Sequence, residues 1–384
     1  CLDNAMLKFL DGRLNVKGNP NENFARELME LYTIGRGLEG TLPEATEQGD
    51  YFNFKEEDVQ AAARILSGFD VDEDFVTIDQ ETTLPRGRAR GGINATQHDT
   101  GSKQFSDRLD NAVINPDPAL IADPLVTNEE VAIDEISQLI ELLYSKNETA
   151  RHICRKIYRF FVYHDITPEI ESNIIAEMAN TFISSGYKIQ NVIEELMTSQ
   201  HFYDANAGVD DNNFGGIIKS PLDLILQTIQ FFELSLPDYT GDLSNFYELT
   251  SDLLRSMDYQ GLDFYEPFEV AGYSAYHQYP VYNRNWISTN YLTRRYDFVR
   301  QFLEGMDMMG SMNSFDLLQF IRDNFPNNVA ENAESLIIAL VEYMLPVSDN
   351  LTFGDNDDNA EVTNERLRYF RYAFLYDPQI DADP

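Results

Sequence analysis

A loop that places a histidine beside an aspartate is the stretch of the sequence best suited to chemistry. It covers residues 97–103 and reads QHDTGSK. A histidine can exchange a proton near neutral pH or bind a metal, and a neighbouring carboxylate can orient it or share a cation. His98 and Asp99 are therefore candidate catalytic or ligating residues, and Lys103 is a candidate binding residue. The alternative is that hydrogen bonds from His98 and Asp99 only anchor the loop.

Three aspartates alternate just upstream, at Asp70, Asp72 and Asp74. Their oxygens are hard ligands that suit calcium. The run lacks the glycine and the final glutamate of an EF-hand loop, and the acidic run at 355–359 has the same defect. Calcium is thus the one cofactor that the sequence suggests, and a solvated acidic loop is the alternative. None of the five histidines shows the HEXXH spacing of a zinc site.

A helix is expected over residues 19–35, because the sequence has capping signals at both ends. Asn19 suits the N-cap, Pro20 the first helical position, and Glu22 the third position of a capping box. Gly35 supplies the left-handed residue that ends such a helix. Apolar residues recur on one face at helical spacing, and they are Phe24, Leu28, Leu31 and Tyr32.

The opposite face of this helix is charged. Glu22, Arg26 and Glu30 follow one another at i,i+4 steps, with Asn23 and Glu27 beside them. This face is either solvated or part of a buried polar network or site. In the second case Arg26 and Glu27 are candidate catalytic residues, and Asn23 and Glu30 are candidate binding residues.

A basic stripe lies at helical spacing over residues 149–163. It consists of Arg151, Arg155 and Arg159, with His152 and Lys156 alongside. Such a cluster could bind a carboxylate, sulfate or phosphate group. We favour the other interpretation, an internal counterweight to acids such as Glu22, Glu27 and Glu30.

Two more basic residues, Arg64 and Lys219, lie beside apolar helix faces. Burying these charges one by one would be costly. The simplest arrangement is one polar centre shared by the charged segments, with His98 and Asp99 entering from their loop. Arg64, Arg155, Lys156 and Lys219 are therefore candidate binding residues.

Aromatic residues gather over 259–286, a segment that ends at the only tryptophan, Trp286. Aromatic faces stack on sugars and peptides. The alternative is that a long loop packs its aromatic side chains onto a helical body. No nucleophile elbow, Walker loop or dinucleotide fingerprint occurs in the sequence, which argues against nucleotide-dependent chemistry.

The formal net charge is −37, from 65 acidic and 28 basic side chains. This charge argues against binding to nucleic acid or to an anionic membrane surface. It suits surroundings rich in salt or divalent cations, which screen self-repulsion. No run of about 18 apolar residues occurs, so no transmembrane segment is expected. Of the two cysteines, Cys154 lies among apolar helix positions and is expected to be an inert core thiol.

Five motifs in order resemble those of a bacterial family, domain of unknown function 1800 (DUF1800). They are NENFARELMELYTIG at 21–35, EDVQAAARILSGF at 57–69, HDTGSK at 98–103, residues 150–162, and IKSP at 218–221. The resemblance covers about residues 1–300. It implies an exported bacterial protein, and a DUF1501 protein, which resembles alkaline phosphatases and sulfatases, as partner. It also makes Gly272-Tyr273 and Trp286 the counterparts of a family aromatic stretch, although extra tyrosines precede the tryptophan here.

Residues 1–10 resemble a helix from inside the family rather than the tether of a lipoprotein that begins at Cys1. We therefore expect a longer protein whose N-terminal segment packs on the face made by Met6, Phe9 and Leu10. Residues 1–300 are expected to form the family domain without its N-terminal region. Residues 301–384 are expected to add C-terminal helices to the same body.

No window shows sustained period-2 alternation, so the sequence predicts an all-α fold. We expect a large irregular bundle of about a dozen helices with long loops, including an irregular segment over 69–126. After the first two motifs, a helix is expected from Thr127 with an apolar stripe that runs to Leu143. Further helices are expected at 149–163, 168–185, 188–199, 221–234, 242–257, 286–306, 314–324, 331–345 and 361–375.

Two function classes fit these observations. The first is a non-catalytic binding or assembly protein at the cell envelope or surface. The second is a hydrolase or metal-assisted enzyme that acts on an extracellular polymer around His98, Asp99, Arg26 and Glu27. The lack of any recognised catalytic constellation favours the first.

Overall fold

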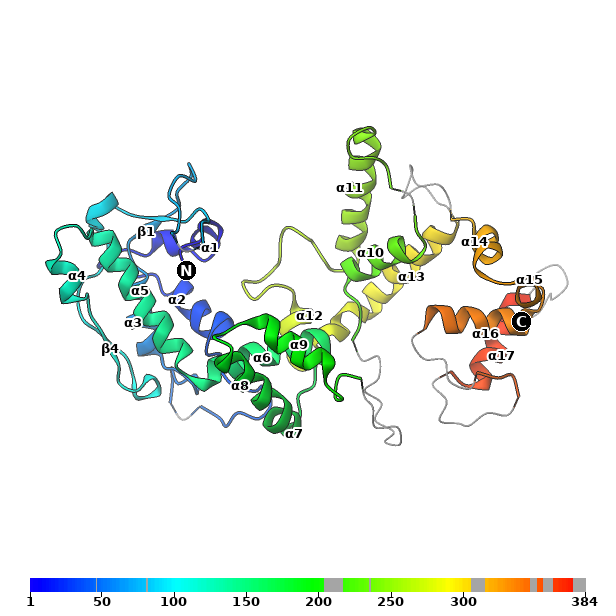
Figure 1. Cartoon of the computed structure of the whole chain (residues 1–384), viewed down its shortest axis with the longest axis horizontal. Helices are drawn as coiled ribbons and strands as arrows, with labels where there is room; N and C mark the ends of the chain where they lie inside the picture. Colours follow the sequence, from blue (N-terminus) through cyan, green and yellow to red (C-terminus); the bar gives the residue numbers. More distant parts are fainter. Residues whose placement is uncertain are drawn as a thin grey trace. The chain divides into compact units, whose positions relative to one another are not determined.

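The computed structural model describes residues 1–45, 47–80, 82–203, 217–234, 236–304, 315–345, 351–354 and 362–375. Helices account for 56% and strands for 5% of this part of the chain (Figure 1). The prediction of an all-α bundle with about a dozen substantial helices is confirmed. The acidic run at 355–359 lies outside the described residues.

The chain divides into two compact units. Unit 1 comprises Cys1–Leu224 and Met257–Leu292, and unit 2 comprises Ile225–Ser256 and Thr293–Pro384. The predicted division at residue 300 stays a prediction.

Unit 1 contains the helices that carry the family motifs, and three longer helices run across the division between the units. The helices of unit 1 are α1 (Asn4–Phe9), α2 (Asn23–Glu27), α3 (Glu56–Ile65), α4 (Pro118–Ala122), α5 (Asn128–Tyr144), α6 (Asn147–Phe161), α7 (Pro168–Ile170), α8 (Ala176–Ser184), α9 (Ile189–Thr198) and α12 (Ser274–His277). The helices across the division are α10 (Pro221–Phe231), α11 (Leu243–Tyr259) and α13 (Thr289–Glu304).

Short helical and extended pieces join these helices. Two π-helices continue α2 and α7, namely η2 (Leu28–Tyr32) and η5 (Glu171–Ile175), and the 3₁₀-helix η6 spans Tyr282–Ile287. Four two-residue strands pair antiparallel, β1 (Phe69–Asp70) with β2 (Arg88–Ala89) and β3 (Lys103–Gln104) with β4 (Val113–Ile114). The irregular segment predicted over 69–126 is therefore held by two minimal ribbons.

Helix α5 shows how local sequence sets an element in unit 1. The predicted capping box forms, because the Thr127 hydroxyl accepts from the Glu130 N–H while the Glu130 carboxylate accepts from the Thr127 N–H. The apolar stripe then packs against α3 in the first hydrophobic core. Its buried members include Ile136, Leu139 and Leu143. The capping and stripe predictions for this helix are confirmed.

A second core of unit 1 joins α6, α8 and α9. Cys154 is fully buried within it, and burial raises the pKa of its thiol to about 12, as expected of an inert core residue. At the N-terminal end of the unit, Leu10 is buried whereas Phe9 is 49% exposed. Packing of this face on a further segment stays a prediction.

Among the described residues of unit 2, the C-terminal helices build two small hydrophobic cores. These helices are α14 (Leu317–Asn324), α15 (Asn327–Ala330), α16 (Ala333–Met344) and α17 (Asn364–Leu375). Helix α16 packs against both α15 and α17. In neither unit does a described helix have the length and apolar character needed to span a membrane.

The structure corrects the expected helix over 19–35. Asn19 pairs with Val16 in a turn at Gly18, and the helix begins only at Asn23, whose N–H donates to the Asn21 side chain at 3.0 Å. From Leu28 to Tyr32 the helix is π, so the i,i+4 register does not continue from Arg26 to Glu30. Gly35 does end the helix in the left-handed conformation, with φ +62°.

Gly35 also allows α6 to approach the end of the π-helix. A Cβ added to Gly35 would lie 2.3 Å from the Nδ1 of His152, whereas one added to Gly18, at φ +80°, would meet nothing within 4 Å. Gly18→Ala should cost about 1–2 kcal/mol of unfolding free energy, from left-handed strain alone. Gly35→Ala should cost about 2 kcal/mol more because of overpacking.

Urea unfolding of the two variants measures this difference. Combining Gly35→Ala with His152→Ala should recover most of the excess cost, as expected for residues in contact. Equal losses of unfolding free energy in Gly18→Ala and Gly35→Ala would show that the contact between Gly35 and His152 does not affect stability.

Candidate functional site

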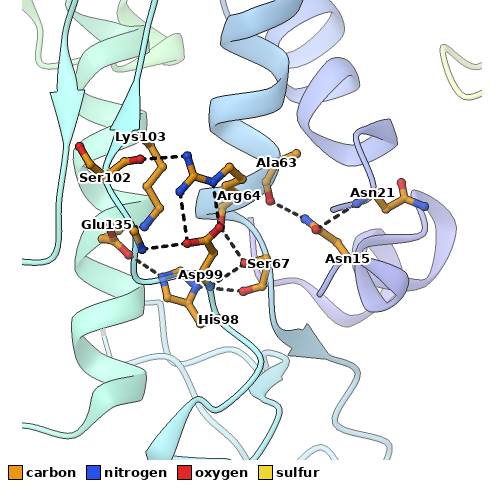
Figure 2. Close-up of polar contacts among 11 residues, drawn as sticks. Asn15, Asn21, Ala63, Arg64, Ser67, His98, Asp99, Ser102, Lys103 and Glu135 are labelled. Atoms are coloured by element: carbon orange, nitrogen blue, oxygen red, sulfur yellow. Dashed lines mark hydrogen bonds and ion pairs between the residues drawn. The ribbon is translucent and has the colours of Figure 1, made fainter. Parts of the chain in front are cut away.

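The loop with His98 docks on the C-terminal end of α3, where helix carbonyls lack partners within the helix. The Asn15 side chain donates to the Ala63 carbonyl at 2.7 Å, and His98 Nδ1 lies 2.9 Å from the Ser67 carbonyl. Gly68, at φ +85°, makes the approach possible, because a Cβ there would lie 2.5 Å from the backbone of Gln97 and His98. Figure 2 shows these side chains at the end of α3.

A buried carboxylate on α5 receives both basic residues of the loop. Glu135 Oε2 lies 2.5 Å from His98 Nε2, and its Oε1 accepts from Lys103 Nζ at 2.5 Å (Figure 2). The Glu135 and Lys103 side chains are fully buried, and that of His98 is 2% exposed. A carboxylate in such a position is stable only when its partners remain in place.

The hydrogen bonds of His98 fix where its protons lie. The Ser67 carbonyl can only accept, so His98 Nδ1 must carry a hydrogen. The contact between Nε2 and the Glu135 carboxylate then needs one further proton, held by either group. Desolvation lowers the pKa of Lys103, although Glu135 opposes this effect. His98 therefore uses both ring nitrogens inside the protein.

Asp99 forms a second pair beside this one. Arg64 Nε donates to Asp99 at 2.8 Å and Nη2 donates at 3.3 Å, while Arg64 Nη1 reaches the Ser102 carbonyl at 2.9 Å. The hydrogen bond from Arg64 lowers the pKa of Asp99 to about 2. Asp99 is thus ionised at neutral pH and holds the loop against the edge of α3.

The other end of the loop is also fixed. Lys103 lies in strand β3, opposite Ile114 of β4. Two residues beyond that strand, the N–H and hydroxyl of Ser106 donate to the buried Asp58 carboxylate of α3, at 2.6 and 2.7 Å. The loop is therefore held beside the end of α3 by His98 and Asp99, and on α3 again by Ser106.

The charged face of α2 forms its own network with α3. Arg26 donates to both oxygens of Glu56 at 2.6 and 3.0 Å and to Glu22 at 3.3 Å, and the Tyr51 hydroxyl donates to Glu56 at 2.7 Å. Arg26 lowers the pKa of Glu56 to about 2, whereas desolvation, with Glu56 nearby, raises the pKa of Glu22. About a third of each carboxylate side chain is exposed.

Three other candidates lie around this network. Glu30 pairs with Arg36 at 2.6 Å, because the π-turn removes it from the register of Arg26. Desolvation, followed by the nearby Glu30, raises the pKa of Glu27. The Asn23 side chain donates to the Leu10 carbonyl at 3.2 Å and so fixes α1 to α2.

The basic stripe of α6 is an internal network, as we favoured, but its partners differ from those expected. Arg155, only 4% exposed, pairs with Glu148 and Glu171, both at 2.6 Å, and Arg151 also pairs with Glu171. Arg159 pairs with Glu39. The prediction of Glu22, Glu27 and Glu30 as partners was wrong. The carboxylates that pair with the stripe are Glu148 of α6 itself, Glu171 and Glu39.

Lys156 and His152 both approach the carbonyl of Leu31 in the π-helix. Lys156 Nζ donates to it, and His152 Nε2 lies 3.3 Å away. Desolvation, with Lys156 nearby, lowers the pKa of His152 to about 4. His152 is therefore neutral at pH 7, and the two side chains complete the unsatisfied end of the helix.

The three alternating aspartates do not converge on a common point. Asp70 pairs with Arg90 at 3.0 Å, and the buried Asp72 carboxylate accepts from the N–H groups of Val76 and Thr77. Asp74 is exposed. No group of three or more His, Cys, Asp or Glu side chains suited to a metal occurs among the residues that the structure describes.

The aromatic candidates pack inside unit 1. Trp286 is 2% exposed and lies beside Tyr273 and Tyr276, with ring centroids 6.1 and 5.9 Å away. The Tyr273 hydroxyl donates to the Asp263 carbonyl. This arrangement fits the packing alternative. Lys219 is exposed directly before α10.

The structure thus brings His98, Asp99, Arg64 and Lys103 together. In the contacts described above, Arg26 and Arg155 belong to separate networks, not to one shared centre. Sequence reasoning missed the carboxylates that organise each network, namely Glu135, Glu56, Glu171 and Glu39. One signal was present, because Glu135 falls on the apolar stripe of α5, four residues after Val131 and four before Leu139.

The fold and the site define a helical protein whose motif residues are joined by buried ion pairs. The chain belongs to the family described as protein of unknown function DUF1800, whose sequence profile matches residues 1–366. The family resemblance seen in the motifs is thereby confirmed. No curated protein and no solved structure matches the chain.

Replacing one partner of the ion pair between Lys103 and Glu135 should lower the unfolding free energy more than replacing both partners together. Lys103→Met leaves the buried Glu135 with His98 alone and should cost about 3–5 kcal/mol of unfolding free energy. The double variant Lys103→Met/Glu135→Gln removes both charges and keeps an amide as hydrogen-bond partner for His98 Nε2. It should recover at least about half of that loss.

Chemical denaturation of wild type, both single variants and the double variant measures the coupling. Simple additivity of the two single losses would contradict a shared buried pair.

His152 should make the protein less stable in mild acid. Its pKa is about 4 in the folded protein and 6.5 in the unfolded chain, so the unfolded chain binds the extra proton first. Stability is then complete above pH 6.5 and declines as the pH falls toward 4, by about 1–3 kcal/mol.

The matched variant is His152→Gln, which keeps a donor for the Leu31 carbonyl but cannot titrate. The unfolding free energy of the two proteins, measured from about pH 7.5 to 4, should diverge in this window. Parallel curves would show that His152 is protonated equally in both states.

Proposed function

We propose that this chain is an exported bacterial protein that binds or assembles with a partner at the cell envelope or surface, without catalysis. One observation carries the proposal. The most site-like residues of the sequence are held by internal partners. His98 and Lys103 are buried on Glu135. The partly exposed Asp99 is paired with Arg64. These contacts support an anchoring role for the loop.

A catalytic base must reach the proton that it removes, directly or through one water. His98 Nδ1 contacts the Ser67 carbonyl, and His98 Nε2 contacts the Glu135 carboxylate. Asp99 spends its carboxylate on Arg64 and on the Gly101 N–H. A substrate would have to displace the buried contacts of His98 or the partly exposed pair of Asp99 with Arg64 to engage either residue, which supports the binding interpretation.

The charge of the chain supports a location outside the cell and a partner of particular chemistry. Many of its basic residues neutralise internal carboxylates, so the surface carries most of the net charge of −37. Such a surface attracts basic patches or divalent cations and repels anionic polymers. The partner we propose is a DUF1501 protein, as the family resemblance implies, and calcium is the cofactor that could bridge the two.

A hydrolase of an extracellular polymer is the second candidate, and the Arg26 network favours it. Glu22 and Glu56 are both partly exposed, and their surroundings shift the two pKa values in opposite directions. Carboxylates with separated pKa values are typical of an acid and base pair. The candidate pair is therefore Glu22 and Glu56 with Arg26, rather than His98 with Asp99.

The test combines binding and turnover with the full chain. Calorimetric titration with a DUF1501 protein from the same organism, with and without calcium, should give a saturable complex. His98→Gln should lower the melting temperature by several degrees, yet leave the affinity within about twofold below that temperature.

Hydrolysis assays on polysaccharide, peptidoglycan and protein provide the opposing result. Turnover that disappears in Glu56→Gln but persists in the control Glu44→Gln, at an exposed glutamate, would establish the enzyme instead. Loss of partner binding in a folded His98→Gln variant would place the binding site at His98 and contradict the anchoring role.

A further inference from the structure

A second polar cluster lies in unit 1, around Tyr282 of η6. It comprises Arg159 at the end of α6, His164 just after that helix, and Tyr282 with Asn283 on η6. We infer that this Tyr282 cluster binds an uncharged ligand, such as a sugar residue, by hydrogen bonds to the hydroxyl groups of the ligand. The inference is independent of the assembly role proposed above.

Side chains from separate segments meet at the Tyr282 ring. The Arg159 guanidinium carbon lies 4.8 Å from the ring centroid, and the His164 ring centroid lies 6.1 Å from it. Tyr163 and Tyr279 flank this pair, with ring centroids 4.3 Å from His164 and 6.4 Å from Tyr282 respectively. The cluster therefore joins polar tips to an aromatic surround, a combination that suits sugar rings.

Three polar atoms of the cluster are buried and have no hydrogen-bond partner among the residues that the structure describes, namely Arg159 Nε, His164 Nδ1 and Asn283 Oδ1. The Tyr282 hydroxyl is also buried, and desolvation, together with the Glu39 carboxylate beside it, raises its pKa. Tyr282 is 3% exposed, His164 7% and Asn283 8%. Leaving a buried donor or acceptor unsatisfied costs about 1–3 kcal/mol each, so native proteins keep very few of them. Their concentration at one place indicates that something else satisfies them.

Tyr282 is also held in an unfavourable backbone conformation. Its φ is +44°, in the left-handed region that bulky side chains rarely adopt. Residues kept in such conformations cluster at ligand-binding and catalytic positions, because the surroundings must enforce the strain. The conformation holds the Tyr282 ring between Arg159 and His164.

The charges and hydrogen-bonding types of the cluster define the ligand. Glu39 neutralises Arg159 through one N–H on each Nη atom, at 2.6 and 3.3 Å, and the buried Nε of Arg159 is a further donor outside this pair. Desolvation, with Arg284 nearby, lowers the pKa of His164, so its ring is neutral. Asn283 Oδ1 can only accept, while neutral His164 Nδ1 and the Tyr282 hydroxyl suit either role. This set carries no net charge and matches hydroxyl groups, which donate and accept at one atom.

The experiment titrates neutral sugars into the full chain. D-glucose, D-galactose and N-acetyl-D-glucosamine are added separately to millimolar concentration, and binding is followed by calorimetry or by NMR shifts. At least one should saturate a single site. Tyr282→Phe removes one hydrogen-bonding group and should weaken that binding about tenfold. Tyr265→Phe, at a 75% exposed tyrosine, is the matched control and should have no effect.

The change in melting temperature of each protein on addition of sugar gives a second readout. Added sugar should raise the melting temperature of the wild type and of Tyr265→Phe, and raise that of Tyr282→Phe by clearly less. Absence of binding by all three sugars would overturn the inference, because buried water would then satisfy the cluster. Binding that survives both Tyr282→Phe and His164→Leu would also overturn it, as would binding of sodium sulfate in place of the sugars.

Discussion

The fully buried carboxylate of Glu135 is the constraint on which the first core of unit 1 depends. It has two cationic or proton-sharing partners, His98 and Lys103, which lie five residues apart on the loop after β2. Removing either partner would leave charge in a dry interior, so the loop cannot leave α5 without a large loss of stability. The position of the loop on α3, the pairing of Arg64 with Asp99 and the short strand β3 all follow from this anchor.

Much of this fold could be predicted from local sequence. The capping box at Thr127, the proline starts at Pro168 and Pro221 and the apolar stripes gave helices within a few residues of those observed. The errors fell where long-range contacts compete with local signals. Asn19 has the chemistry of an N-cap, yet the turn with Val16 uses it. The π-turn after Glu27 leaves no local mark, because the contacts of Leu31 with α6 fix its geometry.

The pairing of charges was harder to predict than the helices for a physical reason. An apolar stripe is a property of one helix, whereas an ion pair needs the relative positions of two elements. The basic stripe of α6 was recognised as internal, but Glu171 and Glu39, far apart in sequence, supply its partners. A carboxylate on an apolar stripe, such as Glu135, is the local sign that such a pair exists. Such a carboxylate predicts that a basic side chain pairs with it, but it does not predict which segment supplies that side chain.

The distribution of the basic residues also explains how so acidic a chain can hold together. Arg26, Arg64, Arg155 and Arg159 each pair with carboxylates of a different helix or loop, so each cation joins two elements as well as neutralising charge. Arginine suits this role because its planar fork bonds both carboxylate oxygens. The acids that lie on the surface repel one another. Screening by salt or divalent cations would relieve that repulsion while leaving the buried pairs nearly unchanged, since buried charges are screened far less. Such a chain gains stability in an ion-rich medium, which is compatible with the export that we propose.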